Sequence, residues 1–314
     1  MKQFTRPLIA VVLLLGVFKL GFIDLNQLST SLKNPLITTL GVGLFFFHAL
    51  IFALRWKILV NLETTYLYKS ALKDSFIGNF FNFFIPSGVG GDVVKALSVS
   101  ERQNISKKVS FSLVTVDRVL GLFCLILFSS SFLLVEYVID SKSDITRLLQ
   151  ISLLLLGLAC LGLLFLYHSK KIIPLLKEKF SFFLINKLIS FAEQVQASIE
   201  KALQTKFILK FISISFLGQF FSVGFLYITC AILTDSHISV FLFLPLACFA
   251  FMASAIPLTP AGIGVGQAAF YFIFSIISTE VATAVTTSIS LMQFFMLLLS
   301  LPGGYFFALS RKSA

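Results

Sequence analysis

Long apolar runs recur along the whole chain and constrain its fold more than any other feature. A helix needs roughly 20 mostly apolar residues to cross about 30 Å of hydrocarbon, and several runs reach this length. The runs cover residues 8–23, 36–60, 109–138, 148–167, 207–233, 238–256, 268–277 and 281–309. Because lipid offers no partner to open backbone N–H and C=O groups, such runs cross a membrane as helices. The sequence therefore predicts an all-α, polytopic membrane bundle of about eight transmembrane helices, forming a single domain over residues 1–314.

The composition excludes an ordinary soluble domain. Hydrophobic residues make up 57% of the chain and charged residues only 12%, which is about half the usual charged fraction of soluble proteins. The net charge of +11 raises the question of nucleic-acid binding, but no basic stripe or recognition motif accompanies it. The positive residues lie between the apolar runs, where they contact anionic lipid head groups. We therefore expect membrane lipids, and no nucleic acid, as partners.

Lysines and arginines gather at alternate connections between the runs. The opposite connections hold only Lys33, Lys142 and Arg147, beside several carboxylates. Because cytoplasmic loops are enriched in Lys and Arg, we expect a multi-pass protein of the cytoplasmic membrane with both termini in the cytoplasm. Eight crossings, an even number, place both termini on the same side of the membrane. This count requires that residues 76–92 dip into the membrane and return, and that the short run after Gly266 crosses.

Cysteines and histidines give no indication of a disulfide, a metal site or a cofactor. All four cysteines fall inside apolar runs without CxxC pairing, which is typical of small buried side chains. The three histidines lie far apart in sequence and lack the spacing of metal ligands. No glycine-rich segment matches a nucleotide-binding loop. We therefore predict no metal, no cofactor and no catalytic residue.

The run of residues 76–92 is broken by a proline and by three glycines, at Gly88, Gly90 and Gly91. Pro86 removes a backbone donor, and glycine permits close backbone approach. Open backbone survives at membrane depth only inside protein or beside a watery cavity, so a re-entrant loop on a substrate path is the favoured interpretation. The alternative is a plain cytoplasmic turn whose Asp92 caps the following helix.

Residues 256–267 repeat the same chemistry, with two prolines followed by alternating glycines. Paired Gly/Pro interruptions in two halves of a membrane protein indicate the central site of a transporter. The free N–H groups of a broken helix can hold phosphate oxygens without any side-chain charge. The two broken segments are therefore expected to bind substrate together.

Asp117 and Arg118 lie two to three turns inside an apolar run, and intramembrane charges usually face a partner or a cavity. Arg118 could hold a lipid phosphate with two hydrogen bonds while Asp117 orients it. An internal ion pair that fixes helix packing explains the same residues equally well. Arg55 and Trp56 close the second run, and their simplest interpretation is an interfacial anchor.

Residues 171–204 differ from the rest of the chain, because apolar residues recur there at helical spacing among charged ones. This pattern predicts a cytoplasmic amphipathic helix. The helix could lie along the cytoplasmic interface or pack on the inner end of the bundle, and an ordinary connector helix with no role in lipid binding explains the pattern equally well.

Four pieces in this order carry a resemblance to a known family. They are Arg55-Trp56; Asn79 with residues 85–92 and Lys95; Asp117-Arg118 with Gly121; and residues 257–264. Over nearly its whole length the chain resembles the transmembrane region of lysylphosphatidylglycerol synthases, a family of flippase-like membrane proteins. The resemblance implies a membrane protein that moves, or acts on, a phospholipid or a polyprenyl-linked substrate.

The resemblance also limits the expected activity. Larger relatives carry a soluble domain that makes aminoacyl-lipid, and we expect no such synthase domain here. Members often carry Glu at the position of Gln267, so the neutral side chain weakens the case for a proton-coupling or cation role. The predicted substrate-binding residues are Arg55, Asn79, Pro86, Gly88, Gly90, Gly91, Asp92, Lys95, Asp117, Arg118, Pro257, Pro260, Gly262, Gly264 and Gln267.

Three functions are compatible with these features. The first is translocation of a phospholipid or polyprenyl-linked lipid that bears phosphate. The second is a non-catalytic partner of a separate lipid-modifying enzyme, with residues 171–204 as its docking surface. The third is a lipid-linked glycosyl or aminoacyl transferase component, and the lack of a paired-carboxylate motif argues against it. The sequence leaves the oligomeric state, the head group and the direction of transport open.

Overall fold

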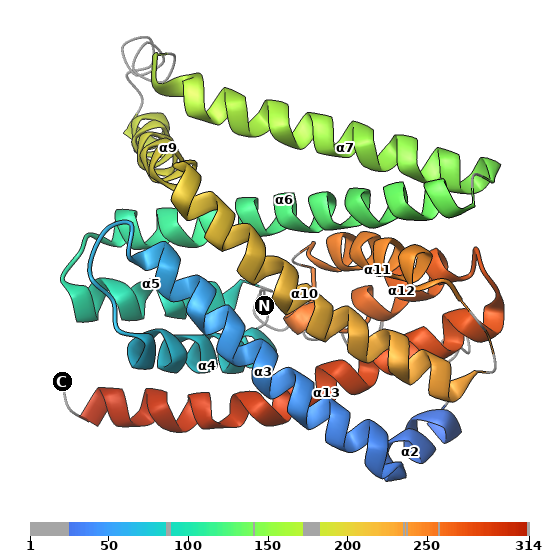
Figure 1. Cartoon of the computed structure of the whole chain (residues 1–314). Helices are drawn as coiled ribbons and strands as arrows, with labels where there is room; N and C mark the ends of the chain where they lie inside the picture. Colours follow the sequence, from blue (N-terminus) through green and yellow to red (C-terminus); the bar gives the residue numbers. More distant parts are fainter. Residues whose placement is uncertain are drawn as a thin grey trace.

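The computed structural model of the protein describes residues 25–85, 89–140, 142–171, 183–234, 236, 238–256 and 258–312. The regular elements in this part of the chain are all helical (Figure 1). Five of the helices are long and apolar enough to cross a membrane. They are α3 (Pro35–Val60), α6 (Lys107–Ile139), α7 (Ser143–His168), α10 (Thr205–Leu233) and α13 (Thr279–Lys312).

These five helices confirm five of the predicted runs, and the all-α polytopic bundle is confirmed with them. The first predicted run, residues 8–23, lies outside the described residues. The short helix α2 (Leu25–Lys33) follows it and leads into α3. Asn34 begins α3, because its side-chain oxygen accepts hydrogen bonds from the N–H groups of Leu36 and Ile37, 3.0 and 3.4 Å away.

Two shorter helices, α4 (Tyr68–Phe84) and α5 (Gly90–Gln103), pack against each other as a hairpin. At 1.5 Å per residue, their 17 and 14 residues fall short of a bilayer crossing. The hairpin starts and ends at the end of the bundle where the C-terminus lies (Figure 1). Glycines allow the close approach, because a Cβ atom on Gly91 would lie 1.9 Å from the carbonyl oxygen of Gly78. This is the geometry expected of a re-entrant hairpin.

A second hairpin enters from the opposite end (Figure 1). It comprises α11 (Val240–Ser254), the 3₁₀ turn η2 (Pro260–Gly262) and α12 (Val265–Phe274). The chain reverses through three residues with positive φ, Ala261 at 49°, Gly262 at 70° and Gly264 at 86°. We name the two pairs the first hairpin (α4–α5) and the second hairpin (α11–α12).

The second hairpin corrects the predicted number of crossings. The runs at residues 238–256 and 268–277 were expected to cross separately, but α11 and α12 have only 15 and 10 residues. Such lengths, about 22 and 15 Å, cover roughly three quarters and one half of a 30 Å hydrocarbon core. The two runs therefore form one hairpin that returns to its own side.

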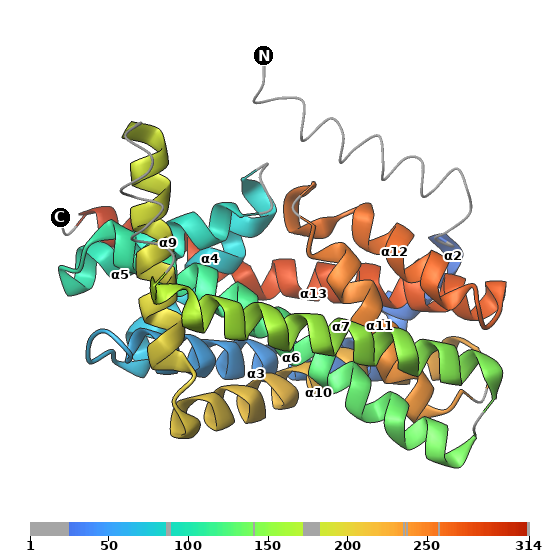
Figure 2. The ribbon, with the colours of Figure 1, turned by 90° about the horizontal axis from the view of Figure 1, so that it is seen from above.

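The amphipathic segment is present as α9 (Phe183–Ala202), and it packs against α6 and α7. Figure 2 shows α9 at the end of the bundle that also holds α5 and the C-terminus. Val195, Ile199 and Ala202 are buried in the core, and the Ser198 hydroxyl lies 3.1 Å from that of Ser112. Of the two expectations for this helix, the structure shows packing on the end of the bundle.

Each hairpin has its own core, and the space between them holds the candidate site. Ala96 and Val99 of the first hairpin pack with Trp56 and with residues of α6. Phe243 and Phe270 of the second hairpin pack with residues of α10 and α13. The tips meet near the middle of the bundle, where α4 contacts η2.

Candidate functional site

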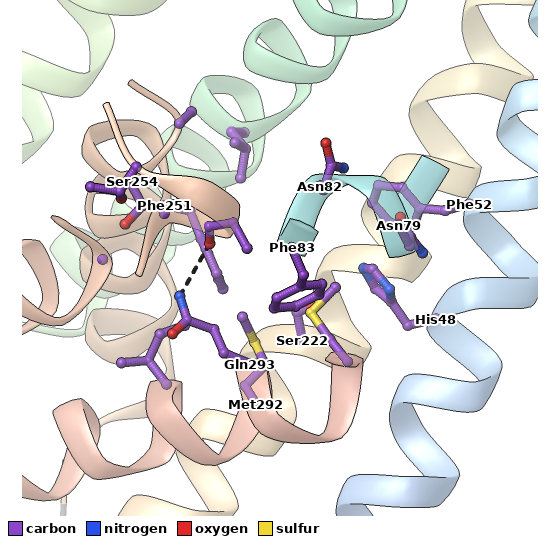
Figure 3. A pocket seen from close by; sticks show the side chains of 18 of the residues that line it. His48, Phe52, Asn79, Asn82, Phe83, Ser222, Phe251, Ser254, Met292 and Gln293 are labelled. Carbon is purple, nitrogen blue, oxygen red and sulfur yellow. Dashed lines mark hydrogen bonds between the residues drawn. The ribbon is translucent and has the colours of Figure 1, made fainter. Parts of the chain in front are cut away.

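A cavity of about 340 Å³ lies between the tips of the two hairpins. Its walls come from α3, α4, α6, α10, α13 and the second hairpin, so six parts of the chain build it together (Figure 3). Apolar side chains such as Phe52, Phe83 and Met292 contribute to the lining. The polar lining residues are His48, Asn79, Asn82, Arg118, Gln219, Ser222, Ser254, Thr259 and Gln293. Polar groups at this depth in an apolar bundle indicate a binding site.

The tip of the first hairpin is fixed by a side-chain amide. Asn82 Oδ1 accepts a hydrogen bond from the backbone N–H of Gly91 at 3.0 Å, which satisfies a free donor at the start of α5. Asn79 lies one turn before Asn82 and lines the same cavity (Figure 3). Asp92 lies in the first turn of α5, and α5 has no side-chain N-cap hydrogen bond. The carboxylate oxygen Oδ2 of Asp92 pairs with Arg118 of α6.

The tip of the second hairpin is held by two glutamines. Gln267 Oε1 accepts from the N–H of Gly264 at 2.7 Å, and Gln267 Nε2 donates to Gln293 Oε1, also at 2.7 Å. Gln293 in turn donates to the carbonyl oxygen of Ala261 at 3.3 Å (Figure 3). Gln267 is 3% exposed and lies behind the cavity, while Gln293 lines it. The neutral amide therefore shapes the broken helix, which needs both a donor and an acceptor at this position.

Five charged residues form a cluster beside the cavity, which we call the charge cluster: Arg55, Asp92, Lys95, Asp117 and Arg118. Arg118 Nε and Nη2 each lie 2.7 Å from Asp92 Oδ2, and Arg55 Nη2 lies 3.0 Å from Asp117 Oδ2. Lys95 Nζ lies 3.9 Å from the centroid of the Trp56 ring, a cation–π contact. Three cations and two carboxylates leave a net charge of +1.

The structure shows the internal ion pair that was one of the two interpretations of Asp117 and Arg118. The other interpretation, in which Asp117 orients Arg118, is not found, because successive residues of a helix point about 100° apart. Asp117 therefore reaches Arg55 on α3, and Arg118 reaches Asp92 on the first hairpin. Arg55 and Trp56 are 8% and 0% exposed, so the interfacial anchor suggested for them is wrong.

Arg118 is the cation that a ligand can reach. Its side chain is 50% exposed, whereas the side chains of Arg55, Asp117 and Asp92 are 10%, 14% and 19% exposed. Among the described lining residues, Arg118 is the one that carries a formal charge. A guanidinium with free N–H groups at a cavity wall is suited to a phosphate.

A second buried carboxylate holds α4 and α5 together near the open end of the first hairpin, away from its tip. Asp74 of α4 is 0% exposed and accepts hydrogen bonds from Tyr66 and, at 2.6 Å, from Ser98 of α5. Arg102 lies 3.3 Å from the same carboxylate. Burial, and then the charge of Asp74, raise the pKa of Tyr66, so its hydroxyl stays protonated and donates. Asp74 ties α4 to α5 and borders the charge cluster, because its charge also attracts that of Lys95.

The predicted site residues fall on the two sides of the cavity. Asn79, Arg118 and Gly262 line it, and the others that are described lie behind the lining in the charge cluster or at the hairpin tips. The residues behind the lining are Arg55, Gly90, Gly91, Asp92, Lys95, Asp117, Pro260, Gly264 and Gln267. Pro86, Gly88 and Pro257 lie outside the described residues.

The sequence interpretation missed several lining residues, above all His48, Gln219 and Gln293. Each lies inside a long apolar run, so polarity at membrane depth was the feature that could have identified them. His48 stacks on Phe52 with ring centroids 4.2 Å apart, and the guanidinium carbon of Arg55 lies over the Phe52 ring, 4.4 Å from its centroid. Phe52 thus connects the cavity wall to the charge cluster.

Comparison with known proteins gives one match. The model of the family described as "Lysylphosphatidylglycerol synthase TM region" matches residues 5–300. The matched region contains both hairpins and the whole charge cluster. No curated protein and no solved structure matches the chain.

Proposed function

Because the chain belongs to the lysylphosphatidylglycerol synthase TM-region family, we propose that it translocates a phospholipid or polyprenyl-linked lipid across the cytoplasmic membrane. The observation that carries this proposal is the polar cavity between two hairpins that enter the bundle from opposite ends. Each hairpin covers only part of the membrane thickness, so both tips lie close to one shared site. A polar head group could occupy this site while its tails stay in lipid.

The physical obstacle to lipid translocation is the transfer of a charged phosphate into hydrocarbon. In the proposed mechanism Arg118 contacts the phosphate at the cavity wall, and Asp92 holds the guanidinium in place. The buried Arg55, Lys95 and Asp117 add the positive excess that makes an anion favourable there.

The distribution of basic residues supports an orientation. The end of the bundle that holds the first hairpin, α9 and the C-terminus carries most of the lysines and arginines, so we assign it to the cytoplasm. The first hairpin would then enter from the cytoplasmic side and the second from the outer side. Anionic membrane lipids are the proposed partners.

The partner-subunit function receives less support. It needs an exposed apolar docking face on residues 171–204. In α9, Val195 and Ile199 are already buried against the bundle, and Leu188 is the one large apolar side chain of the described part of this helix that is exposed. A transferase function needs a carboxylate that faces the cavity, and the described lining contains neither Asp nor Glu. Translocation therefore remains the function that the cavity supports best.

The test is fluorescent-lipid movement in proteoliposomes that contain the purified protein. Wild type is expected to move phosphate-bearing lipids between leaflets, and Arg118→Ala is expected to lower the rate at least tenfold. Arg147→Ala is the matched control, because this arginine is 77% exposed on α7 and remote from the cavity. Unchanged movement in Arg118→Ala would remove Arg118 from the site, and no movement by wild type with any lipid would refute translocation.

A further inference from the structure

The charge of the cavity wall restricts what it can bind. In the described lining, Arg118 is balanced by Asp92 behind it, and no carboxylate faces the cavity. The neighbouring Arg55, Lys95 and Asp117 bring the net charge of the charge cluster to +1. An ammonium group that enters this cavity would find no counter-charge and would be repelled by the cluster, at a depth where water screens little.

The same wall offers unused neutral hydrogen-bonding groups. Asn79, Gln219 and His48 make no hydrogen bond to any described residue, although all three line the cavity (Figure 3 labels Asn79 and His48). Buried polar groups without partners are costly in an apolar bundle unless a ligand or water satisfies them. Amides and imidazole both donate and accept, which is the chemistry that hydroxyl groups require.

From these two observations we propose that the cavity recognises a hydroxyl-rich phosphate head group, a polyol or a sugar, and excludes cationic aminoacyl head groups. Arg118 contacts the phosphate, and Asn79, Gln219 and His48 contact the hydroxyls. This inference rests on the proposed function for its lipid substrate. It departs from the aminoacyl head group that the family description suggests, because the lining lacks the carboxylate that a lysyl group would need.

The size of the cavity agrees with a single head group. Small-molecule sites usually span about 300–1,000 Å³, and a cavity of about 340 Å³ lies at the lower end of this range. A phosphate with one glycerol or one hexose suits such a volume, and acyl or prenyl tails do not. The tails would therefore remain outside, in the lipid.

The test measures binding and keeps it separate from transport. Purified protein in nanodiscs of neutral lipid is titrated with phosphatidylglycerol, with a polyprenyl phosphate–hexose and with lysylphosphatidylglycerol, and binding is followed by native mass spectrometry. At least tenfold tighter binding of one or both hydroxyl-rich lipids than of the lysyl lipid is expected. The first two probes distinguish a glycerol-based from a prenyl-based source of the same head-group chemistry. Equal or tighter binding of lysylphosphatidylglycerol would overturn the inference.

A variant that adds a negative charge to the cavity wall makes the test independent of absolute affinity. Gln219→Glu places a carboxylate of nearly the same shape on the cavity wall, so the preference for the hydroxyl-rich lipid is expected to fall at least fivefold. Gln150→Glu introduces the same change on the exposed face of α7 and should leave the preference unaltered. If both variants behave alike, the lining does not set head-group choice and the inference fails. If the preference appears in binding but no lipid moves in proteoliposomes, the proposed translocation fails while the head-group assignment stands.

Discussion

The two hairpins have the same shape but are held together by different chemistry. In both, a side-chain amide accepts from a glycine N–H at the break, Asn82 at Gly91 and Gln267 at Gly264. The first hairpin adds charge, because Asp92 and Lys95 lie on its second helix and join the charge cluster. The second hairpin depends on neutral amide bonds and on backbone with positive φ.

This difference suggests a division of roles across the cavity. The side formed by the first hairpin and α6 supplies the cation that attracts phosphate, and the side formed by the second hairpin supplies a shaped, neutral wall. A single charged side limits the electrostatic cost of a site in hydrocarbon, since each buried charge needs a partner. Variants that act on one side only test this division of roles.

The largest effect is expected from Asp117→Asn. Arg55 is 8% exposed and has Asp117 as its ion-pair partner, so the substitution leaves a buried charge uncompensated. Breaking a buried pair in this way costs about 3–5 kcal/mol. Thermal unfolding in detergent should show a marked loss of stability. Asp92→Asn is the matched comparison, because Arg118 is half exposed; it should cost about 0–1 kcal/mol and reduce lipid binding instead. Equal stability loss in the two variants would contradict the separation of a structural and a ligand-binding ion pair.

Gly91→Ala should affect the first hairpin next most strongly. The added Cβ atom would lie 1.9 Å from the carbonyl oxygen of Gly78, so α4 and α5 must separate. We expect a cost of about 2–3 kcal/mol in the free energy of unfolding, measured in the same way. Gly157→Ala on α7 is the control, because its Cβ atom meets nothing within 4 Å, and it should be neutral or stabilise by up to about 1 kcal/mol.

A smaller difference should separate the two amides at the tips. Gln267→Ala removes the acceptor for Gly264 and the donors to Gln293 and Ser290, whereas Asn82→Ala removes the acceptor for Gly91. We expect about 2 kcal/mol for Gln267 and about 1 kcal/mol for Asn82, from the value of single buried hydrogen bonds and caps. Hydrogen exchange of the tips would locate each loss in its own hairpin. The reverse order would mean that the neutral hairpin does not depend on its glutamines.

The smallest effect is expected from a variant of α9, outside both hairpins, and this variant serves as a reference for the hairpin variants. A hydrogen bond from Gln196, and then contacts with Lys170, lower the pKa of Glu200 on α9. A lowered native pKa contributes stability above the ordinary carboxyl pKa of about 4.3, and this contribution is lost as the pH falls through the lowered value. The stability difference between wild type and Glu200→Gln should therefore be small at pH 7 and vanish in acid. A difference that grows in acid would contradict the sign of this pKa shift.

The sequence predicted much of this molecule because membrane helices obey local rules. Five of the long runs are found as helices, and the chain breaks at both Pro/Gly segments, where local backbone chemistry favours a break. The intramembrane position of Asp117 and Arg118 was equally readable, because a charge in an apolar run is visible without a structure. Membership of the family followed from the order of the same pieces.

Only the tertiary structure decided how these pieces meet. Hydropathy gives the length of an apolar run but not the direction of its helix. The sequence therefore could not distinguish a hairpin, in which α12 returns beside α11, from two separate crossings of the membrane. The partner of each charge depends on which helix faces it, and neighbouring residues of α6 face different helices. The cavity is the clearest case, because His48, Asn79, Gln219 and Gln293 are far apart in sequence and converge only when both hairpins are packed. Local chemistry therefore determined the elements and their breaks, whereas long-range packing determined the site.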